Sequence, residues 1–223
     1  MFVQRISFVA VLCVVLGALP LVAQTQPSGP RAELGPQAAE PHPDYGAIDG
    51  NHYVNGYFGF SYRYPSGWKG NAVQASTFGT SQYALFTANP EDARATDMRY
   101  ITIVADPLPK NTTPKTFMDG ALKTFASPSS GFGVLHADKN YTFGGKQFYR
   151  LDLMSKSTPG SPTIYQTQVF VLLPNYAVTF SFMAGNPDDI ETSVHSLESV
   201  SFEPDHSATT AAHTAKVEKS QSH

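Results

Sequence analysis

The sequence predicts an α+β fold in which a β-sheet built from hairpins is covered by helices on both faces. Residues 100–105 (Tyr-Ile-Thr-Ile-Val-Ala) are apolar on both faces, as is typical of a central strand that is buried on both sides. Strand-like runs joined by short turns occur together with two amphipathic helical segments, so we expect a sandwich rather than a one-sided sheet.

The size and composition of the chain are those of one domain with tails. It has 223 residues, of which 41% are hydrophobic and 12% aromatic, which suffices for a core. The formal charge is −3, and neither sign of charge is clustered. This balance does not favour nucleic acid or an anionic membrane surface as a partner.

Residues 1–23 are typical of a secretory signal peptide. Arg5 precedes an apolar run over residues 8–19, and small or apolar residues precede a cleavage point before Gln24. The only cysteine is Cys13, so the cleaved chain would contain no thiol for a disulfide, a nucleophile or a metal. The alternative is that the segment stays uncleaved and anchors the chain in a membrane.

Two segments without core-forming patterns flank the expected domain. Residues 24–50 contain five prolines and four glycines, which predicts a flexible linker. Residues 204–223 are rich in Ser, Thr, Ala, Lys and His and have no apolar stripe, which predicts a disordered tail. The expected domain is therefore residues 51–203.

The domain opens on an aromatic strand that runs into a tight turn at residues 65–67 (Pro-Ser-Gly) and the only tryptophan, Trp68. Alternation places Arg63 on one face of the strand and the aromatic residues on the other face, which we expect to pack into the core. We expect Trp68 to close one end of that core. The residues of the predicted buried face are Phe58, Phe60, Tyr62 and Tyr64.

This stretch resembles the start of the Mog1/PsbP-like family, with its phenylalanine-rich strand followed by Tyr-Pro-x-x-Trp. The late segments 148–153 and 169–182, a final helix and the closing residues 199–202 are similar to the C-terminal half of that family. The resemblance covers about residues 51–203. It implies an antiparallel sheet flanked by helices, an α/β/α sandwich, used mostly as a binding or assembly module.

Further strands are predicted between the opening strand and the C-terminus. Residues 81–87 form a strand pattern, and 89–92 are expected to form a turn or a single helical turn. One hairpin is expected over 141–153, where Gly144-Gly145 supply the positive φ of a tight turn. A second hairpin is expected to join 163–173 to 176–183 through Pro174-Asn175.

The first predicted helix begins after Thr113, a good N-cap, with Pro114 at its first position. It is expected to end at Ser127-Pro128. Its apolar stripe should pack on the sheet and comprises Phe117, Met118, Ala121, Leu122 and Phe125.

The second predicted helix begins after Asn186, with Pro187 at its first position. Asp188 and Asp189 oppose the positive end of the helix dipole. Its buried stripe is predicted to comprise Ile190, Val194 and Leu197.

No nucleophile, phosphate-binding or metal-binding motif occurs in the sequence. The expected domain has three histidines. Of these, His136 is expected within a strand and His195 in solvent, and His52 belongs to no catalytic grouping. A metal site at Asp188, Asp189 and Glu191 is the alternative to capping, which explains the two aspartates. No catalytic, cofactor-binding or metal-ligating residue is therefore assigned.

These observations favour an exported, non-catalytic binding or assembly module, secreted or periplasmic, with a protein partner in the cell envelope. The expected contact surfaces are two polar loops, 155–162 and 127–133, because binding residues concentrate on loops of a rigid scaffold. Two alternatives stay open. One is a membrane-tethered structural domain, and the other is a hydrolase with a dispersed site that uses His136.

Overall fold

The computed structural model describes residues 46–202 apart from 74–81, 95 and 157–159, together with Pro43. The predicted signal peptide, most of the predicted linker and the predicted tail lie outside these residues.

Two antiparallel sheets form in the described part of the chain. The larger has the strand order β4-β5-β6-β10-β9-β8-β7, and the smaller has the order β1-β2-β3-β11. The elements are β1 (Ala47–Asp49), β2 (His52–Asn55), β3 (Phe60–Arg63), β4 (Trp68–Ala72), β5 (Tyr83–Pro90), β6 (Tyr100–Pro107), α1 (Pro114–Ala126), η1 (Pro128–Ser130), β7 (Phe132–Phe143), β8 (Lys146–Ser155), β9 (Tyr165–Leu173), β10 (Tyr176–Ala184), α2 (Pro187–His195), η2 (Ser196–Ser199) and β11 (Ser201–Phe202).

The strand pattern of the large sheet agrees with the sequence at its centre and at its hairpins. β6 lies between β5 and β10, and residues 101–105 are buried, as predicted for a central strand. The β7–β8 hairpin turns at Gly144 and Gly145, whose φ angles are 53° and 75°. The β9–β10 hairpin turns at Pro174-Asn175, where Asn175 has a φ of 65°. Both predicted hairpins are confirmed.

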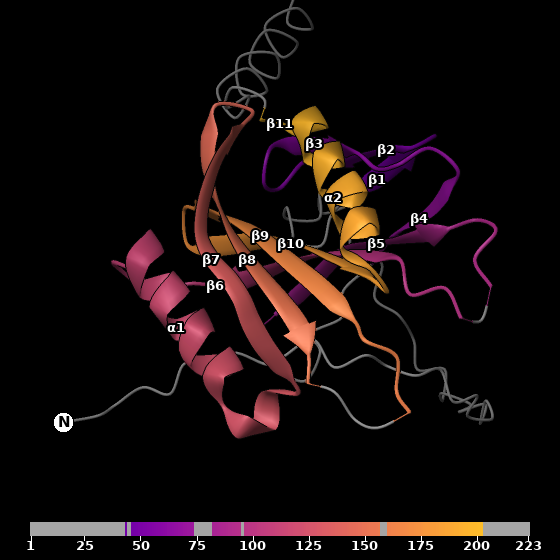
Figure 1. Ribbon diagram of the computed structural model, residues 1–223. Coiled ribbons are helices and arrows are strands. Elements are labelled where there is room, and N and C mark those ends of the chain that lie inside the picture. Colours follow the sequence, from indigo (N-terminus) through magenta and orange to yellow (C-terminus); the bar gives the residue numbers. More distant parts are fainter. Residues whose placement is uncertain (1–42, 44–45, 74–81, 95, 157–159, 203–223) are drawn as a thin grey trace, which may run out of the picture.

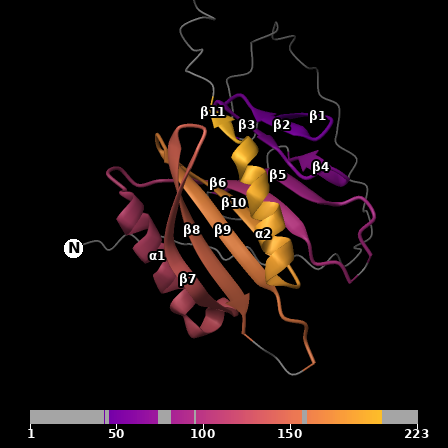
Figure 2. The same ribbon diagram turned by 45° about the horizontal axis from the view of Figure 1, so that its top comes forward.

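Different elements cover the two faces of the large sheet (Figure 1). On β10, Ala177 packs with the α1 side chains, whereas Val178 and Phe180 pack with α2 and the small sheet, because successive strand residues point to opposite faces. Figure 2 shows α1 apart from α2 and the strands of the small sheet. The α+β class is confirmed. A helical layer was predicted on both faces of the sheet, but on the face opposite α1 it is incomplete. There α2 has only nine residues and shares the face with the small sheet.

Helix α1 forms as its capping residues predict. The Thr113 side chain accepts a hydrogen bond from the Thr116 N–H, and the Thr116 hydroxyl accepts one from the Thr113 N–H. Pro114 occupies the first turn, and the helix ends at Ser127. Its buried side chains include Phe117, whose ring packs on Phe170 of β9 with centroids 4.6 Å apart. No helix in the described part of the chain is long and apolar enough to span a membrane.

The opening aromatic strand is buried as predicted but is shorter. Phe60, Tyr62 and Tyr64 are buried and Arg63 is exposed. Gly59 has a φ of 62°, so the chain turns there and the strand starts only at Phe60. Trp68 is half-buried at the start of β4 and packs at the margin of the core, so it does not close the core as fully as predicted.

Part of the predicted linker is folded, which corrects the predicted domain boundary. β1 pairs antiparallel with β2, and Ile48 of β1 packs against the core. The Pro43 carbonyl accepts a hydrogen bond from Asn55 Nδ2 at 3.3 Å. The fold therefore begins before Asn51. A three-residue edge strand contains too few apolar residues to produce an alternating pattern in the sequence.

Candidate functional site

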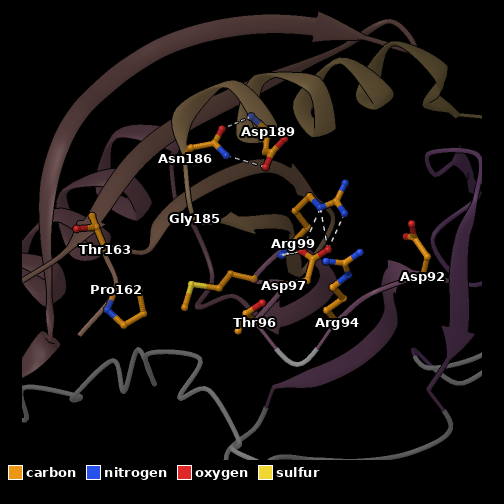
Figure 3. Close-up of a pocket in the computed structure, with 11 residues that line it drawn as sticks. Asp92, Arg94, Thr96, Asp97, Arg99, Pro162, Thr163, Gly185, Asn186 and Asp189 are labelled. Atoms are coloured by element: carbon orange, nitrogen blue, oxygen red, sulfur yellow. Dashed lines mark hydrogen bonds and ion pairs between the residues drawn. The ribbon is translucent and has the colours of Figure 1, made fainter. Parts of the chain in front are cut away.

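A polar groove lies at the end of the large sheet where β10 leads into α2 (Figure 3). Its volume is about 600 Å³. One wall comes from the connection between β5 and β6, a second from the residues before β9, and a third from the N-terminus of α2. The polar residues that line it include Asp92, Arg94, Asp97, Arg99, Asn186 and Asp189.

The β5–β6 connection places two arginines in the groove by local hydrogen bonds. The Ala93 N–H donates to the Pro90 carbonyl at 3.2 Å, and the Asp97 N–H donates to the Arg94 carbonyl at 2.8 Å. These turns follow directly on β5 and lead into β6, both of which pair within the large sheet. The connection is therefore anchored to the large sheet at both ends.

Asp97 and Arg99 form a fixed ion pair in this connection. Arg99 Nε donates to both carboxylate oxygens of Asp97, at 3.0 and 3.2 Å, and Nη2 lies 2.6 Å from Oδ2. The Arg99 N–H also donates to Asp97 Oδ1 at 2.9 Å. Chiefly through the side-chain hydrogen bonds, Arg99 lowers the pKa of Asp97, and Asp97 raises the pKa of Arg99. Both groups stay ionised at neutral pH, and each side chain is the ion-pair partner of the other.

The N-terminus of α2 forms a polar wall because its cap is a side-chain amide. Asn186 Oδ1 accepts from the Asp189 N–H at 2.9 Å, and Asn186 Nδ2 donates to Asp189 Oδ2 at 2.8 Å. This cap confirms the role predicted for Asn186. It also fixes the carboxylate of Asp189, whose charge helps to raise the pKa of Arg99.

Arg94 differs from Arg99 because its guanidinium is exposed and makes no ion pair with any residue of the described chain. Figure 3 shows it on the same wall as Asp97, with Asp92 beside it. A guanidinium presents a planar set of donors that matches a carboxylate or a phosphate. The groove therefore offers one available cation next to carboxylates that can receive a ligand's donor groups.

The three histidines considered as catalytic candidates lie on separate elements. His52 is half-buried on β2, and His136 is exposed on β7. His195 is exposed at the end of α2, where its Nδ1 lies 3.2 Å from Glu198 Oε1. The structure therefore places His136 in a strand and His195 in solvent, as predicted.

Two of the acidic residues of α2 have separate partners. Asp189 bonds to Asn186, and Glu191 bonds to Arg150 of β8. Among the residues described, no three His, Cys, Asp or Glu side chains are grouped so that they could hold a metal ion.

One of the two predicted contact loops is not a loop. Residues 127–133 contain η1 and the start of β7, and the Ser130 hydroxyl bonds to the carbonyls of Phe125 and Phe132. Lys156 Nζ donates to the Ser127 carbonyl at 3.0 Å, which ties this segment to the chain after β8. Ser127 caps η1 as well as ending α1, so a polar sequence here forms helix ends rather than a loop.

The other predicted loop, 155–162, reaches the groove at its end. Ser155 belongs to β8, residues 157–159 lie outside the described chain, and Pro162 lines the groove. The groove residues between Asp92 and Arg99 were not predicted. An Asp and an Arg two residues apart in a turn are the sequence signal that could have indicated the ion pair.

The comparisons with known proteins concern the fold. No protein-family model matches the chain, and no curated protein sequence matches it. Among solved structures, cyanobacterial PsbP (CyanoP) from Synechocystis is similar with a TM-score of 0.49 and 15% identity, over 68% of this chain and 91% of that chain. LpqN, involved in cell envelope biogenesis of Mycobacterium tuberculosis, is similar with a TM-score of 0.44 and 15% identity, over 65% and 83%.

The Ran-binding protein Mog1p of Saccharomyces cerevisiae is similar with a TM-score of 0.43 and 9% identity, over 68% of this chain and 85% of that chain. PsbP and Mog1p are the two kinds of protein that the sequence resemblance named. At these identities the similarity to the solved structures concerns the fold alone.

Proposed function

We propose that the chain is an exported, non-catalytic binding module that contacts a protein partner in the cell envelope through the groove beside α2. The observation that carries the proposal is Arg94, an exposed guanidinium without an ion-pair partner in the described chain, beside the fixed Asp97–Arg99 pair. Arginine is among the residue types that are enriched at protein interfaces and their hot spots.

The chemistry of the groove suits a polar segment of a protein that carries an acidic side chain. Arg94 would bind the carboxylate, and Asp92 and Asp189 would accept hydrogen bonds from backbone or side-chain donors of the same segment. The walls are anchored to the large sheet and to the capped start of α2. Such a preformed groove loses little conformational entropy when a ligand binds.

Export is supported by the signal-peptide pattern of residues 1–23. The mass of the chain recovered from the source organism distinguishes export from tethering, since cleavage before Gln24 removes the apolar run over 8–19. A mature chain that still begins at Met1 would favour the membrane-tethered alternative.

The binding proposal is tested by neutralising one exposed cation at a time. Arg94→Gln removes the groove arginine that has no ion-pair partner in the described chain, and Lys123→Gln removes an exposed cation from α1 as a matched control. We expect Arg94→Gln to weaken binding of the partner isolated from an envelope extract by about tenfold or more, as for an interface hot spot. Lys123→Gln should bind like the wild type.

Equal affinities of the two variants would contradict the proposal. Turnover of a hydrolase substrate at a rate that His136→Ala abolishes would replace it by the hydrolase alternative.

A further inference from the structure

A buried arginine connects α2 to the large sheet. Arg150 of β8 has a side chain that is only 4% exposed. Its Nε donates to Asp152 Oδ1 at 2.7 Å, and its Nη1 donates to Glu191 Oε2 of α2 at 3.0 Å. Nη2 bonds to the second Glu191 oxygen, and the Tyr141 hydroxyl accepts from Nη1 at 3.4 Å. The guanidinium is thus held by two carboxylates and a hydroxyl.

The sheet side of this contact is rigid. Thr167 of β9 donates its hydroxyl hydrogen to Asp152 Oδ1 at 2.7 Å, so Asp152 is fixed by a neighbouring strand. Burial by itself lowers the pKa of Arg150, but the bonds to Glu191 and Asp152 outweigh that effect and raise the pKa. Arg150 therefore remains a cation with a fixed direction toward α2.

Helix α2 needs such a contact to define its position along the sheet. Its nine residues are too few for a stable isolated helix, so its placement depends on tertiary contacts. The buried side chains are Ile190, Ser193 and Val194, which set how deeply the helix packs. Apolar contacts are not directional, whereas the two bonds from Arg150 to Glu191 fix a direction and a register.

We propose that Arg150 is the positioning residue of the groove: by holding Glu191 it fixes α2 and thereby the groove wall formed by Asn186 and Asp189. Glu191 lies two residues beyond Asp189 on the same helix, so a shift at Glu191 is transmitted to the wall. The relevance to binding rests on the proposed function, but the positioning itself can be measured without a ligand.

The test compares Glu191→Gln with Glu198→Gln. Glu191 is half-exposed, at 53%, so the variant is expected to fold. Glu198 is an exposed glutamate of η2 whose one ion pair among the described residues is with His195. We expect Glu191→Gln to raise the hydrogen-exchange rates of the α2 amides about tenfold, because the variant loses a charge-assisted hydrogen bond that holds the helix. It should also shift the side-chain amide resonance of Asn186. Glu198→Gln should leave both unchanged.

Two results would overturn the inference. One is α2 exchange in Glu191→Gln that equals that of the wild type. The other is a tenfold rise that extends equally to β6 and β10, which would mean a global loss of stability rather than a local one.

Binding of the envelope partner to Glu191→Gln separates this inference from the proposed function. Local loosening of α2 together with weakened binding supports both. Local loosening with unchanged binding supports the positioning of α2 and overturns its role in the groove, while the Arg94→Gln comparison tests the groove by itself.

Discussion

The turn of the β7–β8 hairpin packs against the last strand of the fold, and this contact makes its two glycines unequal. A methyl group added at Gly144 would lie 2.9 Å from the Val200 carbonyl oxygen and 3.1 Å from the Phe202 nitrogen. A methyl group added at Gly145 would meet nothing within 4 Å. Both residues have a positive φ, which costs a residue other than glycine about 1–2 kcal/mol. Only Gly144 adds overpacking against backbone atoms, at a further ~1–3 kcal/mol.

We therefore predict that Gly145→Ala lowers the free energy of unfolding by about 1–2 kcal/mol and Gly144→Ala by about 2–5 kcal/mol. Urea unfolding of the two variants and the wild type measures the difference, and an unchanged m-value shows that the unfolded states are comparable. A difference of less than ~0.5 kcal/mol between the variants would refute the packing of this turn on β11.

Three further predictions concern the core and its margin. Burial raises the pKa of Asp106 to about 6, against the hydrogen bond from Gln82, so the folded state binds this proton more tightly than the unfolded state. The stability that protonated Asp106 contributes is therefore full at low pH and is lost as pH rises through about 6. Relative to the wild type, the free energy of unfolding of Asp106→Asn should rise by about 1–3 kcal/mol between pH 4 and pH 7, as measured by urea titrations. A difference in unfolding free energy between the two proteins that stays constant with pH would contradict this prediction. Asn55→Ala should cost about 2–4 kcal/mol, since Asn55 is buried and accepts from the Phe58 N–H at 3.0 Å. A melting temperature equal to that of the wild type would exclude that role. Because Trp68 is half-buried, Trp68→Ala should lower the free energy of unfolding by about 1–3 kcal/mol, less than the loss expected for a fully enclosed tryptophan. A loss above ~4 kcal/mol would show that the side chain is fully enclosed.

Local signals explain which parts of the fold the sequence could predict. Thr113 and Asn186 predicted helix starts because a cap depends on residues three positions away. Gly144-Gly145 predicted a hairpin because positive φ is a property of the turn itself. The separation of the strands into two sheets was not predictable in this way. β3 pairs with β11, so that Ser61 lies opposite Ser201, and such a pairing leaves no local pattern.

The groove was less predictable than the fold because three separate segments form it. The capping role of Asn186 was predicted, but its place beside Arg94 and Pro162 depends on how the strands pair. The polar run at 127–133 was wrongly predicted to be a loop, since Ser and Pro favour helix ends as much as loops. Composition identifies polar segments, whereas only the packing of β5, β9 and α2 brings them together.

Site-specific photo-crosslinking tests most directly whether the groove beside α2 binds a protein partner. A photoreactive phenylalanine analogue would replace Thr96, an exposed residue that lines the groove, in one sample and the exposed Lys123 of α1 in another, so that Arg94 stays in place. Both samples would be irradiated in the envelope of the source organism, and we predict a covalent adduct with one envelope protein from position 96, without the same adduct from position 123. Identical adducts from both positions, or none from position 96, would contradict the proposed groove.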